Sequence, residues 1–335
     1  MKKITESFRS LITAVAVLGL LTVGLAGCGG GSSSSDQDVS RQMDMVTVNW
    51  IEGMALTYAQ EAILEDSLNM EVDVREAPKG VAFKSVASGD RDYFNEAWLP
   101  TTHSDIWGQI QNDAQKLGYT YKGTSAGLAV PAYVEINSVT ELPQIREQLD
   151  GKINGIGAGA TVNNQTRQIL KNNNIEGFEV VASSGPATWQ AMETAISNNE
   201  PIVVTGWYPH WKWGSYDLKY LEGAQTGQTP VFGEAEDVFK IVGNDFVETF
   251  PKKSVCFLKH MEVNDEQIES LMGAFRNRGD MSKHEAASQW ISNHPEWVSA
   301  WMNQAEECAA SDEAVEYLPD DAVYSRDQGS DGGNA

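Results

Sequence analysis

Basic residues are scarce in this chain of 335 residues. Twenty-four Lys and Arg stand against 47 Asp and Glu, which gives a formal net charge of −23. A surface of this sign repels phosphate backbones and anionic lipid headgroups, so we expect neither nucleic acid nor a charged membrane surface as a partner. Such acidity is more often a trait that favours solubility than the mark of a site.

The sequence also lacks the short motifs that mark common catalytic sites. It contains no GxSxG, HExxH or P-loop pattern and no clear pair of nucleophile and base. His260, His284 and His294 show no metal-ligand spacing. We therefore expect no enzyme activity, no metal ion and no cofactor.

Long apolar runs are missing as well, although one shorter run follows a basic N-terminus at residues 11–24. This run is shorter than the ~20 residues of a spanning helix, and "LAGC" at residues 25–28 ends it with a lipoprotein-type cleavage site. The pattern predicts a signal peptide at residues 1–27 and lipidation of Cys28. The polar residues 28–43 then form a flexible linker. We expect an extracytoplasmic protein, lipid-anchored to the cell membrane or periplasmic.

Only two cysteines remain beyond Cys28. Because disulfides persist outside the cytoplasm, the sequence leaves open both a bridge between Cys256 and Cys308 and two separate buried thiols. The C-terminal residues 309–335 are acidic and poor in large apolar side chains, which is typical of a disordered tail.

Short β-rich runs alternate with helical patterns through the body of the chain, which favours an α/β fold with mainly parallel sheets. One series has strands at residues 45–50, 70–76 and 91–98, and an apolar strand at residues 127–134 contains a proline suited to an edge or crossing segment. A second series begins at residue 151, and helices dominate after residue 257. We expect two α/β lobes, with the C-terminal segment returning to the first.

Three tryptophans occupy matching positions in this pattern. Trp50, Trp98 and Trp207 each end a predicted strand, where ligands bind in open α/β sheets. The negative face of an indole attracts a cation that donates no hydrogen bonds, at ~0.5–2 kcal/mol per contact. The three residues therefore predict an aromatic cage for a quaternary ammonium group.

An anion site is predicted beside this cage. His103, five residues after Trp98, either donates a hydrogen bond to an anionic end of the ligand or caps the helix that starts near Ser104. The motif "GIGAGAT" at residues 155–161 lies between a strand and a helix, where free backbone N–H groups and the helix dipole favour an anion. Together these features describe a site for a zwitterion, with Tyr208 as a further candidate.

The motifs "VNW", "AWLPTTH", "GLAVPAYV", "ASSGPATWQAM" and "PIVVTGWYPHWKW" resemble the substrate-binding lipoproteins of glycine betaine/proline betaine ABC transporters. The likeness runs from about residue 45 to residue 297. It implies a two-lobed periplasmic binding protein fold of type II-like topology, with two crossing segments and a ligand cleft between the lobes. Lobe 1 would comprise residues 44–132 and 237–308, and lobe 2 residues 133–236.

The resemblance also implies roles for individual residues. The three tryptophans would surround the trimethylammonium group, while His103 and the backbone amides of Gly155 and Ile156 would bind the carboxylate. Residues 155–159 read Gly-Ile-Gly-Ala-Gly where many relatives read Gly-Ile-Asp-Pro-Gly, so this loop lacks a stiffening proline.

By this resemblance the protein captures glycine betaine as a monomer and delivers it to an ABC permease for osmoprotectant uptake. Choline or carnitine are alternative ligands, and a choline site would gain from an acidic group, for which Glu52 and Glu96 are candidates. Two other classes stay open: an enzyme on the same scaffold, with a reactive residue in the cleft, and a sensory subunit with the same site.

Overall fold

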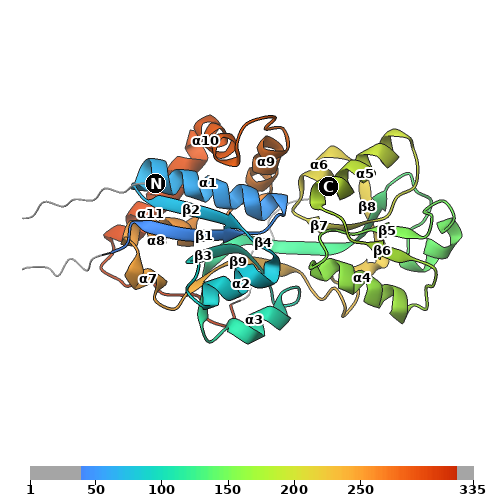
Figure 1. Ribbon diagram of the computed structural model, residues 1–335, viewed down its shortest axis with the longest axis horizontal. Coiled ribbons are helices and arrows are strands. Elements are labelled where there is room, and N and C mark those ends of the chain that lie inside the picture. The colour runs from blue at the N-terminus through green and yellow to red at the C-terminus, as the bar shows by residue number, and fades with distance from the viewer. Residues whose placement is uncertain (1–38, 323–335) are drawn as a thin grey trace, which may run out of the picture. The chain divides into compact units, whose positions relative to one another are not determined.

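The computed structural model describes residues 39–322 as an α/β protein (Figure 1). The strands are β1 (Gln42–Thr47), β2 (Glu71–Glu76), β3 (Tyr93–Leu99), β4 (Ala114–Pro131), β5 (Lys152–Asn154), β6 (Glu179–Val181), β7 (Val204–Tyr208), β8 (Leu218–Gln225) and β9 (Glu236–Gly243). The helices are α1 (Ile51–Leu68), α2 (Lys79–Ala87), α3 (Ser104–Ile110), α4 (Thr161–Asn172), α5 (Gly185–Ser197), α6 (Trp211–Ser215), α7 (Phe246–Thr249), α8 (Lys252–His260), α9 (Asp265–Arg276), α10 (Lys283–Asn293) and α11 (Pro295–Ala310), with a 3₁₀ turn at Val139–Ile145.

The strands follow the order β2-β1-β3-β9-β4-β7-β5-β6, and β8 pairs with β4. Strand β1 is parallel to β2 and β3, and β5 is parallel to β6 and β7. The other pairings, of β9 with β3 and β4 and of β4 with β7 and β8, are antiparallel. The α/β class is therefore confirmed, but the prediction of mainly parallel sheets is wrong.

Strand β4 links two groups of strands. Its residues 114–124 pair with β9, and its residues 125–131 pair with β7 and β8, so this one strand passes from one group to the other (Figure 1). The sequence located only the end of β4, because glycines interrupt its first part. A Cβ on Gly118 would lie 2.4 Å from the carbonyl oxygen of Lys259, so only glycine allows this approach to α8.

Strand β3 is buried along its whole length because both of its faces are covered. Tyr93 and Trp98 join the larger apolar core, which includes α1, α9 and α10. Phe94 and Ala97 join a second core with α2 and α3. The register of β3 against β9 shifts between Phe94 and Ala97, which places a β-bulge just before Trp98.

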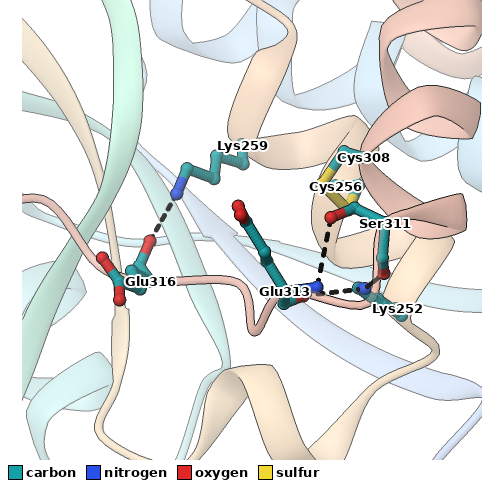
Figure 2. The surroundings of a disulfide bond; sticks show 7 residues. All are labelled: Lys252, Cys256, Lys259, Cys308, Ser311, Glu313 and Glu316. Atoms are coloured by element: carbon teal, nitrogen blue, oxygen red, sulfur yellow. Dashed lines mark hydrogen bonds between the residues drawn. A yellow bond between two sulfur atoms is a disulfide. The ribbon is translucent and has the colours of Figure 1, made fainter.

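A disulfide between Cys256 and Cys308 joins α8 to α11, which decides between the two alternatives left by the sequence (Figure 2). The chain after α11 packs beside it. Lys252 donates hydrogen bonds to the carbonyl oxygens of Ser311 and Glu313, and Lys259 donates one to that of Glu316 (Figure 2).

The prediction of a disordered tail is therefore wrong for residues 311–322. Leu318 donates a backbone hydrogen bond of 2.8 Å to Lys116 and packs against the second core. Lysine side chains donate hydrogen bonds to carbonyl groups of this segment. Apolar periodicity in the sequence does not reveal such contacts.

The signal peptide, Cys28 and residues 323–335 lie outside the described residues. Strand β1 begins at Gln42, inside the predicted linker. Within residues 39–322, no helix has the length and apolar character needed to cross a membrane.

Replacing both Cys256 and Cys308 by alanine should lower the free energy of unfolding by about 2–4 kcal/mol, because the bridge closes a long loop in the unfolded chain. The two cysteines are 52 residues apart in the sequence. Urea unfolding with and without reductant checks this. The oxidised wild type should have a higher urea midpoint than the reduced wild type, and the midpoint of the variant should not depend on reductant. An unchanged midpoint for the reduced wild type would contradict the expectation.

Candidate functional site

A cavity of about 40 Å³ lies where the two groups of strands meet. Its wall is made by Trp50, Glu52, Trp98, Thr102, His103, Ala126, Ile156, Ala160, Thr161, Val162, Gln165 and Trp207. The volume exceeds the ~10–15 Å³ that a single water needs. The structure thus brings together the three predicted tryptophans, His103 and Ile156. Gly155 and Tyr208 are not part of the wall.

The three tryptophans reach the cavity from three different elements. Trp98 belongs to β3 and Trp207 to β7, and both are only 6% exposed. Trp50 lies three residues beyond β1, where its extended backbone forms the N-cap of α1. Since β3 and β7 belong to different groups of strands, the cage is assembled across the junction that β4 spans.

His103 is held against the end of β3 by two hydrogen bonds. Its backbone N–H donates to the carbonyl oxygen of Trp98 at 2.9 Å, and its Nδ1 accepts the backbone N–H of Trp98 at 3.0 Å. Burial, followed by the nearby Lys79, holds the pKa of His103 well below its usual range, so the ring is neutral. Because Nδ1 is an acceptor, the proton lies on Nε2.

The ring of His103 lines the cavity and also has the backbone carbonyl of Glu96 as a hydrogen-bond partner. Its ring is stacked on Trp50, with centroids 6.0 Å apart and planes 18° apart. His103 is the N-cap residue of α3, but its side chain makes no capping hydrogen bond. The contacts thus favour the ligand-facing role over the capping role.

Glu96 supports Trp98 from the bulge in β3. The indole Nε1 of Trp98 donates to Glu96 Oε1 at 2.6 Å. A Cβ on Gly53 would lie 2.7 Å from Glu96 Oε2, so glycine in the first turn of α1 makes room for this carboxyl group. Burial, reinforced by the charge of Glu52, raises the pKa of Glu96 well above its usual range.

Glu52 brings a second carboxyl group into the cavity wall. It is 4% exposed, and burial raises its pKa to about 7, while its own backbone N–H, Lys212 and Trp207 act in the opposite direction. Lys212 is fully buried behind Trp207, with its Nζ 4.5 Å from the ring centroid. Burial lowers the pKa of Lys212 far below its usual value.

The N-terminus of α4 forms the opposite part of the wall, through Ala160, Thr161 and Val162. No side chain caps this helix, and its first turn has no acidic residue. Lys79 donates to Thr161 Oγ1 at 2.8 Å, and that hydroxyl donates to the carbonyl oxygen of Thr102 at 3.0 Å. Helix dipole, Lys79 and His103 together make this side of the cavity suited to an anion.

The two backbone amides predicted to bind a carboxylate already have partners. Gly155 N–H donates to Val181 at 2.9 Å, and Ile156 N–H donates to Asn163 Oδ1 at 3.1 Å. In this structure both amides are therefore used within the protein, while the first turn of α4, five residues further on, has no side-chain cap. Without the sheet register, the sequence could not show which amides of residues 155–161 are used internally.

Tyr208 also lies elsewhere than expected. Asp265 and Tyr121 face its hydroxyl, and burial together with the Asp265 carboxylate raises its pKa above the usual value. Tyr121 itself donates a hydrogen bond to Asp265. Tyr208 therefore connects β7 to α9.

One group of described residues, Glu61, Glu65 and His284, has the composition and spacing to hold a metal ion. His284 Nδ1 lies 3.3 Å from Glu61 Oε2 and 3.9 Å from Glu65 Oε2, which are the distances of an ion pair joining α10 to α1. None of the three lines the cavity. We assign them to the packing of these two helices.

Comparison with known proteins identifies a family for this chain. A model of the substrate binding domain of ABC-type glycine betaine transport systems matches residues 43–293. The glycine betaine/carnitine transport binding protein GbuC of Listeria monocytogenes serotype 1/2a (strain 10403S) is 29% identical over 174 residues, 51% of this chain. The match spans 56% of the length of that curated relative.

Two solved structures are similar over nearly their whole length. Lactococcal OpuAC, in a closed-liganded conformation complexed with glycine betaine, is 29% identical with a TM-score of 0.69, covering 78% of this chain and 99% of its own. The glycine/betaine/L-proline-binding protein ProX from Borrelia burgdorferi is 25% identical with a TM-score of 0.70, covering 79% and 99%.

The fold is that of a solute-binding protein with the two-lobed periplasmic binding protein architecture. The family match extends over well over half of the sequence. The chain belongs to the family of substrate-binding domains of ABC-type glycine betaine transport systems.

Replacing Glu52 by glutamine should change how stability depends on pH. Because the folded-state pKa of about 7 exceeds the ordinary 4.5, the stability contributed by protonated Glu52 is fully present below pH 4.5 and is lost as the pH rises through 7. Glutamine stays neutral at both pH values. The free energy of unfolding of the variant, relative to that of the wild type, should therefore rise by about 2 kcal/mol from pH 5 to pH 8. Urea unfolding at both pH values measures this, with Asp66→Asn on the exposed side of α1 as control. A constant difference between Glu52→Gln and the wild type would refute it.

Proposed function

We propose that this protein captures glycine betaine, or a related quaternary-ammonium zwitterion, and delivers it to an ABC permease for osmoprotectant uptake. The observation that carries the proposal is the convergence of Trp50, Trp98 and Trp207 on one small cavity. Three indole rings attract a trimethylammonium group, which brings no hydrogen-bond donor of its own.

The opposite end of the cavity suits the carboxylate of the same ligand. His103 Nε2–H is a donor on one side, and the uncapped N-terminus of α4 lies on the other, with Lys79 next to both. The match to the family of ABC-type glycine betaine transport systems supports an ABC permease as the partner. The two related solved structures, a complex with glycine betaine and a glycine/betaine/L-proline-binding protein, support the same class of ligand.

The remaining features belong to this proposal as well. The protein would work as a monomer without chemical change of the ligand, lipid-anchored through Cys28. Residues 44–132 and 237–308 would move as one lobe and residues 133–236 as the other, closing on the ligand. The start of β9 at Glu236 agrees with the second boundary, whereas β4 passes to the second group of strands already at residues 124–125, before the first boundary.

Calorimetric titration of the signal-less protein, stripped of co-purified ligand by unfolding and refolding, tests the function. Glycine betaine should bind at one site per chain, and Trp98→Ala should weaken it at least tenfold, because one face of the cage is lost. Trp297→Ala, a half-buried tryptophan of α11 outside the cavity, is the matched control and should keep wild-type affinity. Equal affinities for the Trp98→Ala variant and the wild type would remove the cage from the account.

His103→Ala should weaken glycine betaine by about 10- to 100-fold, because a hydrogen bond to a charged carboxylate is lost. Choline, which has no carboxylate, should lose less affinity in the same variant. The two titrations compare the fold-loss in affinity of His103→Ala for glycine betaine with its fold-loss for choline. Equal losses for both ligands would mean that His103 supports the loop after β3 without binding the carboxylate.

A further inference from the structure

The hydroxyl group of Thr161 joins the two groups of strands at the edge of the cavity. Thr161 is the first residue of α4, which packs against β6 and β7, and Lys79 is the first residue of α2, which packs against β3 and β9. Lys79 Nζ donates a hydrogen bond to Thr161 Oγ1 at 2.8 Å, and the same hydroxyl donates to the carbonyl oxygen of Thr102 at 3.0 Å. One side chain beside β7 is thus bonded to two partners beside β3.

The carbonyl group of Thr102 has a fixed position, because Glu236 holds the loop after β3. The Glu236 carboxyl group accepts the backbone N–H groups of Thr101 and Thr102, each at 2.6 Å, and the hydroxyl of Thr102. A Cβ on Gly233 would lie 2.5 Å from Thr101 Oγ1, so glycine at this position lets the loop pack against the chain that enters β9. The acceptor for Thr161 is therefore set by the fold before any ligand binds.

Both hydrogen-bonding roles of the Thr161 hydroxyl are used within the protein. A hydroxyl carries one proton, and here Thr102 accepts it, so the side chain of Thr161 keeps no donor for a ligand carboxylate. Thr161 and Thr102 line the cavity, whereas Lys79 lines a second pocket of about 510 Å³. Trp50 and Ala160 line both. The bridge from Lys79 to Thr102 therefore lies where the cavity meets this larger pocket, and it closes that side of the cavity.

The bridge exists only while α4 lies next to α2 and to the loop after β3. It therefore stabilises this closed arrangement over any arrangement in which the two groups of strands separate. The cage is complete only in the closed arrangement, because Trp98 and Trp207 belong to different groups. The apparent affinity of a ligand then scales with the fraction of the protein that is closed.

We propose that Thr161 is a positioning residue that latches the cavity shut, and that its hydroxyl raises the affinity for every ligand of the cage by the same factor. This inference rests on the proposed function, because the cage is the ligand site in both. It differs from the role of His103, whose hydrogen bond favours ligands that have a carboxylate.

Calorimetric titration with glycine betaine and with choline tests the latch. Thr161→Val keeps the shape and the backbone N–H of the residue but removes the hydroxyl, so it should weaken both ligands by the same factor, at least fivefold. Thr161→Ser keeps the hydroxyl and should recover most of the lost affinity. Thr194→Val is the matched control, because it removes an exposed hydroxyl that bonds only within α5, and it should bind both ligands as the wild type does.

Urea unfolding of the ligand-free variants separates a loss of affinity from a loss of folding, and Thr161→Val should unfold in one cooperative transition, as Thr194→Val does. Wild-type affinity for glycine betaine in Thr161→Val, or a Thr161→Ser variant as weak as Thr161→Val, would overturn the latch and leave the proposed function standing. A loss for glycine betaine with none for choline would assign the hydroxyl to the carboxylate and would also overturn the latch. A wild type that binds neither ligand would overturn the proposed function and the latch together.

Discussion

A quaternary ammonium ion cannot donate a hydrogen bond, so a protein can hold it only with aromatic faces and with charge that is shielded from water. The structure meets this constraint by bringing indoles from separate elements to one desolvated cavity. Trp98 and Trp207 lie on strands of different groups, and the cage forms only because β4 joins these groups. The long crossing strand thus positions the proposed cage.

Desolvation also governs the polar residues of the site. Burial keeps His103 neutral, which fixes its proton on Nε2 once Nδ1 accepts the backbone N–H of Trp98. The same burial raises the pKa values of Glu52 and Glu96 and lowers that of Lys212. Burial therefore disfavours the charged form of each of these groups, and a cation in the cage would favour the ionised form of Glu52.

Much of this arrangement could be predicted from the sequence. Indoles at the ends of predicted strands indicate that Trp50, Trp98 and Trp207 converge, and the spacing of Trp98 and His103 places the imidazole in the same cavity wall. The disulfide could not be decided, because the distance between α8 and α11 depends on tertiary packing. The sequence suggests Glu52 only as a partner for choline, since nothing in "NWIEG" shows that the first turn of α1 faces the cavity.

Other differences between the sequence predictions and the structure arise from the register in which chain segments pair. The bulge in β3, which turns Glu96 to Trp98, and the use of the Gly155 and Ile156 amides within the structure depend on how chain segments pair. The sequence pattern does not identify β8 or the first part of β4, because neither shows a regular apolar alternation and glycines interrupt the first part of β4. Local patterns identify elements, whereas pairing decides which atoms remain free for a ligand.

The most direct measurement is a crystal structure of the protein with glycine betaine bound. The account predicts the trimethylammonium group between Trp50, Trp98 and Trp207, with the carboxylate oxygens at His103 Nε2 and the N-terminus of α4. A ligand bound outside these three rings, or a cation turned to α4 with the carboxylate among the indoles, would contradict it.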